Sequence, residues 1–265
     1  MLKQRIITAV LLAPILLALV IYGQTWGFAA LIAIIQLAAT WEWLKINQLP
    51  AGLAAINAIT LTALTAVLIF VWPTAPQHWI IVYAVVWLLA VIWLMNHRWG
   101  YDNRPQQTVI KGLLGVVAIM LFAISINQLH EMDRGPWLTL VLFFLIWVAD
   151  IGAYASGKTL GKHKLAINIS PGKTWEGVIG AMIFVGLYAA IISHYLGWVW
   201  WQAMLLMMPI ALFSVVGDLA ASLGKRQAGV KDSSQLLPGH GGFIDRFDSL
   251  IAAAPLFAYF LPHIQ

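Results

Sequence analysis

Two carboxylates and a cluster of glycines stand together near the C-terminus of a chain that is 62% hydrophobic. The stretch LPGHGGFIDRFDS, residues 237–249, places Asp245 and Asp248 three residues apart, directly after a turn rich in glycine and proline. Side chains three residues apart share one face of a helix. Carboxylate oxygens hold hard cations such as Mg²⁺, which also takes phosphate oxygens as ligands. The spacing therefore indicates a site for a divalent cation and a phosphate group.

A third carboxylate precedes this stretch. Asp218 ends the apolar run MPIALFSVVGD, and Ser222 and Lys225 follow four and seven residues later, so a continuing helix presents all three on one face. Lysine and arginine side chains neutralise phosphate charge, arginine as a bidentate fork. The cations available for this role around the two carboxylate segments are Lys225, Arg226, Lys231 and Arg246.

The PGHGG turn between these segments admits several interpretations. Gly241 and Gly242 allow the backbone to approach a nucleotide closely or to form an anion-binding nest. His240 fits the role of a general base, of a donor to phosphate, or of a turn residue that bonds to the backbone. Phosphate oxygens that are already ionised need no base, so we favour a contact between His240 and a substrate.

A second basic segment, GKTLGKHKLAINISPGKTWEG at residues 157–177, carries four lysines. Attraction to lipid headgroups accounts for the lysines but not for the SPGKTWEG part. We expect Ser170 and Pro171 to precede a helix whose first turn holds Glu176. Such a helix start beside Lys173 can bind an anion through free N–H groups as well as charge.

Residues 152–159, GAYASGKT, satisfy the pattern of a phosphate-binding P-loop. That motif works only where it joins a buried parallel strand to a helix. The preceding residues, FFLIWVAD, belong to an apolar helical run, so we reject the motif here. Asp150 ends that run as Asp218 ends its own, and an ionisable group at such a place marks a functional site by default. A buried structural ion pair is the alternative for both residues.

Membrane helices must position these groups. The chain has 265 residues, a mean hydropathy of +0.86 and 9% charged residues, whereas globular domains carry about 25% charged residues. We predict an all-α, polytopic integral membrane protein with about nine transmembrane helices, each of roughly 20 residues. The predicted spans are 6–23, 26–45, 53–72, 79–96, 109–129, 137–157, 176–197, 200–222 and 247–262. A secretory signal is the alternative for the first span, although no clear cleavage site follows it.

Positive charge predicts the orientation of these spans. With the N-terminus in the cytoplasm, 14 of the 15 lysines and arginines fall on the cytoplasmic side, and only Arg134 falls outside. This asymmetry agrees with the positive-inside rule and puts both large polar loops on the cytoplasmic side. We predict one membrane domain, 1–265, with N-terminal helices in 1–135 and the catalytic site in 136–265. Four other acids are predicted to be solvated: Glu42, Asp102, Glu131 and Asp133.

Residues 222–248, SLGKRQAGVKDSSQLLPGHGGFIDRFD, closely resemble the signature of the phosphatidate cytidylyltransferase, or CDP-diacylglycerol synthase, family. That pattern has Ser-x-apolar-Lys-Arg, then Lys-Asp, Pro-x-His-Gly-Gly and Asp-Arg-x-Asp. The ISPGKTWEG and DIGAYASGKTLGK stretches resemble the family as well, in the right order. The N-terminal half matches mainly as apolar spans. Gly224 replaces a large apolar residue and Gly172 a basic one, so we expect looser helix packing before Lys225 and one phosphate contact fewer.

The resemblance implies an Mg²⁺-dependent nucleotidyltransferase that moves CMP from CTP to phosphatidate and releases CDP-diacylglycerol and pyrophosphate. It implies metal binding by Asp218, Asp245 and Asp248, with a second cation left open. The implied catalytic residues are Asp218, Lys225, Arg226, Asp245 and Asp248. The implied substrate-binding residues are Ser170, Lys173, Ser222, Lys231, Asp232, His240, Gly241, Gly242 and Arg246.

The implied partners are CTP, phosphatidate and membrane lipid, with a homodimer left open and no nucleic acid. The expected location is a bacterial inner membrane, with the site on the cytoplasmic side. Two other functions remain as alternatives. A CTP-using polyprenol or dolichol kinase would transfer the γ-phosphoryl group and release CDP. A transporter would distribute paired charges through the midplane, often in repeated halves, but here the charges collect on one face.

Overall fold

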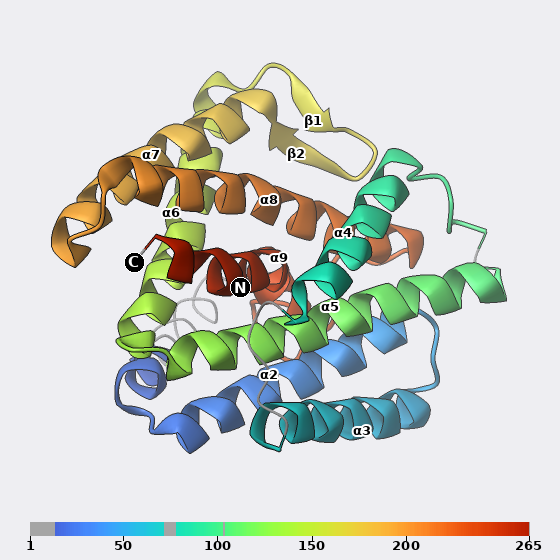
Figure 1. Ribbon diagram of the computed structural model, residues 1–265. Coiled ribbons are helices and arrows are strands. Elements are labelled where there is room, and N and C mark those ends of the chain that lie inside the picture. The colour runs from blue at the N-terminus through green and yellow to red at the C-terminus, as the bar shows by residue number, and fades with distance from the viewer. Residues whose placement is uncertain (1–13, 72–77, 103, 265) are drawn as a thin grey trace.

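The computed structural model describes residues 14–71, 78–102 and 104–264. Within these ranges the chain is mostly helical (Figure 1). Residues 14–22 are helical, and the helices that follow are α2 (Thr25–Ile46), α3 (Ala51–Phe70), α4 (Ile80–Met95), α5 (Pro105–Glu131), α6 (Gly135–Leu160), α7 (Trp175–Leu196), α8 (Trp200–Gln227) and α9 (Ile244–Phe260). Two short strands, β1 (Lys164–Ala166) and β2 (Ser170–Thr174), and a 3-10 helix, η2 (Leu261–His263), complete the described elements.

Six of the described helices are long and apolar enough to cross a membrane: α2, α3, α5, α6, α7 and α8. The shorter helices are α4, with 16 residues, and α9, with 17. The protein is therefore a largely helical membrane protein. The count of nine spans and the orientation stay predictions. Most of the first predicted span, residues 6–23, and the connection at 72–77 lie outside the described residues.

Helix α9 lies in the middle of the fold and packs chiefly against α8 and α5 (Figure 1). Every residue from Ser249 to Pro255 is buried, because alanines at 252–254 let neighbouring helices approach from several sides. Pro255 lies inside the helix without ending it. The helix begins at Ile244, three residues before the predicted span, so its first turn includes Asp245.

Helices α6 and α7 pack along a seam of small residues. A Cβ atom on Gly152 would lie 2.9 Å from the Cβ of Phe184, and one on Gly180 would overlap the Oγ of Ser156. Small residues let the backbones of membrane helices approach closely. The whole GAYASGKT stretch lies inside α6, so the rejection of a P-loop is confirmed, and Gly152 serves helix packing.

A β-hairpin connects α6 to α7. Lys164 pairs with Thr174, and Ala166 with Ser170, in an antiparallel arrangement. Ser170 and Pro171 precede α7, whose first turn holds Glu176, as expected, but residues 170–174 form β2 and are not the helix start itself. Helix α7 begins at Trp175 instead, and the Oγ1 of Thr174 caps it by accepting from the N–H of Gly177 at 3.1 Å.

The predicted topology can be tested by labelling single cysteines, since the natural chain contains none. Lys162→Cys and Lys3→Cys should react with a membrane-impermeant maleimide only in inverted vesicles, and Asp133→Cys should react in intact cells. The reason is that the positive-inside rule places the first two positions in the cytoplasm and the third outside. Labelling of all three positions from the same side would contradict the nine-span topology.

Candidate active site

A cavity of about 500 Å³ opens where α6, α8 and α9 meet the loop that precedes α9. Five acidic and four basic side chains line it. They are Asp150, Asp218, Asp232, Asp245 and Asp248, and Lys225, Arg226, Lys231 and Arg246. Ser222 lines it too, so nine residues of the predicted site reach one cavity. The middle of α6, the later part of α8 and the first turns of α9 form its walls, and the predicted topology places the contributing ends of α8 and α9 on the cytoplasmic side.

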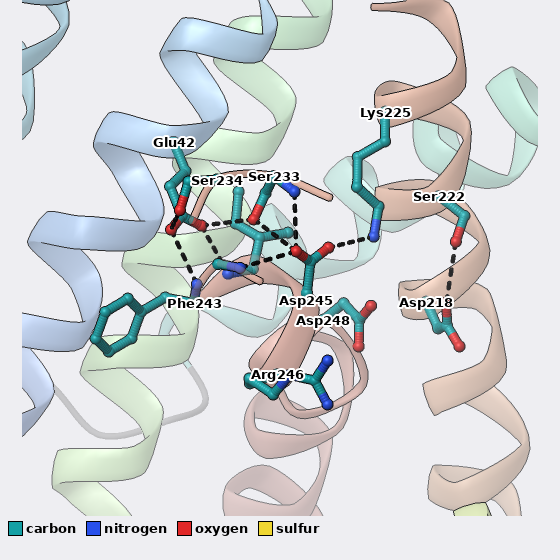
Figure 2. A network of polar contacts seen from close by, with 12 residues as sticks. Glu42, Asp218, Ser222, Lys225, Ser233, Ser234, Phe243, Asp245, Arg246 and Asp248 are labelled. Atoms are coloured by element: carbon teal, nitrogen blue, oxygen red, sulfur yellow. Dashed lines mark hydrogen bonds and ion pairs between the residues drawn. The ribbon is translucent and has the colours of Figure 1, made fainter. Parts of the chain in front are cut away.

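The acidic residues of α8 and α9 meet because these helices pack very closely. A Cβ atom on Gly217 would lie 2.6 Å from the carbonyl oxygen of Asp248 and 2.7 Å from the Cβ of Ala252. A larger residue at 217 would therefore push the helices apart. The next residue, Asp218, lies across the cavity from Asp248, as Figure 2 shows.

Both oxygens of Asp245 are bound by protein groups. Its Oδ1 accepts from the Nζ of Lys225 at 2.5 Å, and the two side chains are only 7% and 10% exposed. Its Oδ2 accepts from the backbone N–H groups of Ser233 at 2.8 Å and Gly242 at 3.0 Å. The Oγ of Ser233 lies 3.1 Å from the same oxygen. Asp245 thus joins α8, α9 and the loop between them.

The environment of Asp245 favours its ionised form. Burial alone would raise the pKa of this carboxyl group, because burial penalises charge. The ammonium group of Lys225 and the N–H groups of Gly242 and Ser233 outweigh burial, so the pKa of Asp245 lies below its ordinary value. The Lys225–Asp245 contact is accordingly a true ion pair at neutral pH.

Asp218 also has a partner on each oxygen. The Nζ of Lys173, on β2, lies 2.6 Å from Oδ2, and the Oγ of Ser222 donates to Oδ1 at 3.1 Å. One turn after Ser222, the Nε of Arg226 donates to the carbonyl oxygen of Ile169 at 3.4 Å. These contacts hold the hairpin against α8, so the two basic segments predicted separately meet at the cavity.

The PGHGG turn lies beside the cavity. Leu237 and Gly241 form an isolated bridge, and the φ of +81° at Gly241 is one that glycine adopts readily. The Nε of Arg246 donates to the carbonyl oxygen of His240 at 2.9 Å. None of Ser170, His240, Gly241 and Gly242 lines the cavity, so a contact of these four with substrate stays a prediction.

The carboxylates differ in how well they fit a metal ion. Among the described residues, no three histidine or acidic side chains form a ready-made metal site. One oxygen of Asp248 accepts from the N–H of Ser249 at 2.7 Å, and its other oxygen has no hydrogen-bond donor in the described chain. A cation at Asp248 therefore fits the donor set, whereas one that also binds Asp218 would have to displace Lys173 from Oδ2 or share Oδ1 with Ser222. A cation on Asp245 would have to displace Lys225.

Glu42 is buried, so the prediction of a solvated side chain is wrong. It lies in α2 with 0% of its surface exposed. Its carboxylate accepts hydrogen bonds from the loop before α9 (Figure 2). The signal was present in the run AATWEWL, because an acid inside a membrane helix is expected to have a specific partner.

The sequence matches the model of the cytidylyltransferase family over residues 3–264. The chain belongs to the cytidylyltransferase family. Curated relatives named phosphatidate cytidylyltransferase include a protein of Pseudomonas aeruginosa, 36% identical over 266 residues, and one of Haemophilus influenzae, 34% identical over 292 residues. These alignments cover 98% of this chain and, respectively, 97% and 98% of the relatives. A relative of that name in Staphylococcus haemolyticus is 30% identical, with 96% of each chain covered.

The two glycines that depart from the family pattern, Gly224 and Gly172, differ in how closely other residues surround them. The expectation that Gly224 loosens helix packing is wrong, because Trp43 of α2 fills the space. A Cβ atom on Gly224 would lie 2.7 Å from the Trp43 ring, and the Nε1 of Trp43 donates to the carbonyl oxygen of Lys111 at 3.0 Å. Gly172 is in open space, with nothing within 4 Å of such an atom.

The hydrogen bonds of the two α9 carboxylates predict different effects on stability. Asp245→Asn should lower the free energy of unfolding by about 1–3 kcal/mol, because an amide leaves Lys225 or a loop N–H group without an acceptor. Asp248→Asn should lower it much less, since an amide oxygen can still accept from Ser249. Denaturant unfolding in detergent measures both values. Equal losses would show that Asp245 does not anchor the loop.

Proposed function

We propose that this protein is a phosphatidate cytidylyltransferase, which transfers CMP from CTP to phosphatidate. An oxygen of the lipid phosphate attacks the α-phosphorus of CTP, and the bond from that phosphorus to the bridging oxygen of pyrophosphate breaks. The products are CDP-diacylglycerol and pyrophosphate. The observation that carries the proposal is the cavity, which gathers nine residues of the predicted site in a chain that belongs to the cytidylyltransferase family.

The cations around the cavity suit the binding of phosphate groups. Lys231 and Arg246 are exposed, so they would hold the two phosphates that leave as pyrophosphate. Lys225 is buried on α8, where it would neutralise charge on the reacting phosphates, and the exposed Arg226 follows it. Lys173 approaches from the hairpin. Phosphoryl-type transfers depend mostly on such positioning and charge neutralisation.

The balance of charge supports the use of a divalent cation. Five acidic side chains line the cavity beside its four cations, so a triphosphate that entered alone would meet several negative charges. When bound, Mg²⁺ neutralises part of the triphosphate charge and polarises the α-phosphate. Asp218 and Asp248 would hold it. The family resemblance adds Asp245 as a third ligand, and this requires Lys225 to leave its Oδ1.

The position of the cavity fits substrates of opposite solubility. CTP is dissolved in water, whereas phosphatidate stays in the lipid leaflet. The walls of the cavity belong to α6 and α8, which are long and apolar enough to cross a membrane, while Lys231 and Arg246 reach water. We place this site at the cytoplasmic face of a bacterial inner membrane, in line with the positive-inside rule.

The reaction can be tested with CTP labelled at the α-phosphate, phosphatidate and Mg²⁺. Label should enter chloroform-soluble CDP-lipid, and Asp248→Asn should reduce the rate about 100-fold, because it removes a carboxylate that would hold the metal beside the reacting phosphates. Asp133→Asn, at an exposed acid, is the matched control. Transfer of γ-label to a lipid, with release of CDP, would support the kinase alternative instead.

The metal can be tested without turnover. Mg²⁺ should raise the melting temperature of the purified protein, because a ligand that binds only the folded state stabilises it. Asp218→Asn and Asp248→Asn should lose this rise, and Asp133→Asn should keep it. A rise of equal size in all variants would contradict the assignment of these two carboxylates.

A further inference from the structure

Glu42 connects the N-terminal half of the chain to the loop that carries the family signature. Its Oε1 accepts from the Oγ of Ser234 at 2.6 Å and from the N–H of Phe243 at 2.9 Å. Its Oε2 accepts from the Oγ of Ser233 at 2.8 Å and from the N–H of Ile244 at 2.9 Å. Figure 2 shows this carboxylate directed into the loop on the side away from the cavity cations Lys225 and Arg246.

The four contacts match the chemistry of an ionised carboxylate. A carboxylate offers about four lone pairs and no hydrogen, and here two hydroxyl groups and two backbone N–H groups point at it. A glutamine at 42 would present an NH₂ group to at least one of these donors. Such a buried mismatch is unfavourable, because a donor without an acceptor keeps the full penalty of leaving water.

The surrounding sequence is adapted to this contact. A Cβ atom on Gly242 would lie 2.5 Å and 2.6 Å from the two oxygens of Glu42. Gly242 therefore makes room for the carboxylate of α2. Ser233 lies between two acids, because its Oγ is 2.8 Å from Glu42 and 3.1 Å from Asp245. The Glu42 and Asp245 carboxylates thus hold opposite sides of the same loop.

Glu42 does not reach the place where chemistry would occur. It is not among the residues that line the cavity, and its 0% exposure keeps it from any substrate. Its partners are Phe243, the N-cap of α9, and Ile244, the first residue of α9, which lie two residues and one residue before Asp245. Any effect of Glu42 on the reaction must therefore pass through the loop and the first turn of α9.

We propose that Glu42 is a positioning residue that fixes the loop at 233–244 and thereby the carboxylate of Asp245 and the cavity wall at Lys231 and Asp232. Without this anchor the loop lacks a fixed partner on its inner side. The part of the proposal that concerns CTP rests on the proposed function. The part that concerns the loop does not.

Hydrogen exchange of the full-length protein in detergent tests the loop directly. In Glu42→Gln, exchange across residues 233–244 should become at least about tenfold faster, because the lost acceptors make local opening easier. Exchange in α6 and α7 should not change. Glu131→Gln, at an exposed glutamate, is the matched control. Unchanged exchange at 233–244 in a folded Glu42→Gln protein would overturn the proposal.

Ser234 provides a milder variant in case Glu42→Gln does not fold. Ser234→Ala removes one donor and leaves Glu42 with three, so exchange at 233–244 should rise by a smaller factor of about two to five. Ser234→Thr keeps the hydroxyl group and should restore the exchange of the natural protein. An equal effect of the alanine and threonine variants would show that the hydrogen bond is not what matters.

Kinetics separate positioning from a general loss of structure. In Glu42→Gln the KM for CTP should rise about tenfold, measured on the folded fraction, because Lys231 and Asp232 lose their fixed place. A purely structural role would lower the amount of active protein and leave KM unchanged. If the natural protein transfers no CMP to phosphatidate, the proposed function fails, and hydrogen exchange still decides whether Glu42 positions the loop.

Discussion

A buried, ionised carboxylate is unfavourable unless cations or hydrogen-bond donors surround it, and this constraint shapes the loop beside the cavity. Glu42 and Asp245 bind the loop before α9 from opposite sides, through backbone N–H groups and serine hydroxyl groups. A loop held only by apolar contacts would have no preferred place, since dispersion and burial are not directional. The directional bonds to two fixed charges give this loop a single conformation, and with it a defined wall of the cavity.

The helices of the N-terminal half support the site without lining it. Lys111 of α5, which is 4% exposed, donates from Nζ to the carbonyl oxygen of Gly100 at 2.9 Å and to the Oε1 of Gln227 at 3.1 Å. The Nε2 of Gln227 in turn donates to the carbonyl oxygen of Trp99 at 2.9 Å. These bonds fix the end of α8 just after Lys225. An enzyme whose signature lies in its C-terminal half thus needs the other half to keep that signature in place.

The parts of this structure that follow from local geometry could be predicted from the sequence. Asp218, Ser222 and Lys225 share a face because helical spacing alone decides it, and the long apolar runs are helices. The contact between Glu42 and the loop joins residues about 200 positions apart, and no local pattern encodes it.

The hairpin between α6 and α7 does not follow from the sequence for another reason. Ser170 and Pro171 are typical of a helix start, but Thr174 competes for that role and caps α7.

The pairing of charges in the cavity bears on how substrates would enter it. Lys173 is paired with Asp218, and Lys225 with Asp245, so two cations suited to phosphate are bound to two carboxylates suited to metal. On the proposed function, a complex of metal and nucleotide would replace the partners in both salt bridges at the same time. Each carboxylate would trade an ammonium group for the metal, and each lysine would trade a carboxylate for a phosphate oxygen. The Lys225–Asp245 pair is nearly buried, and an unpaired buried charge is strongly unfavourable. At this pair the exchange therefore favours joint entry of metal and nucleotide over entry of either alone.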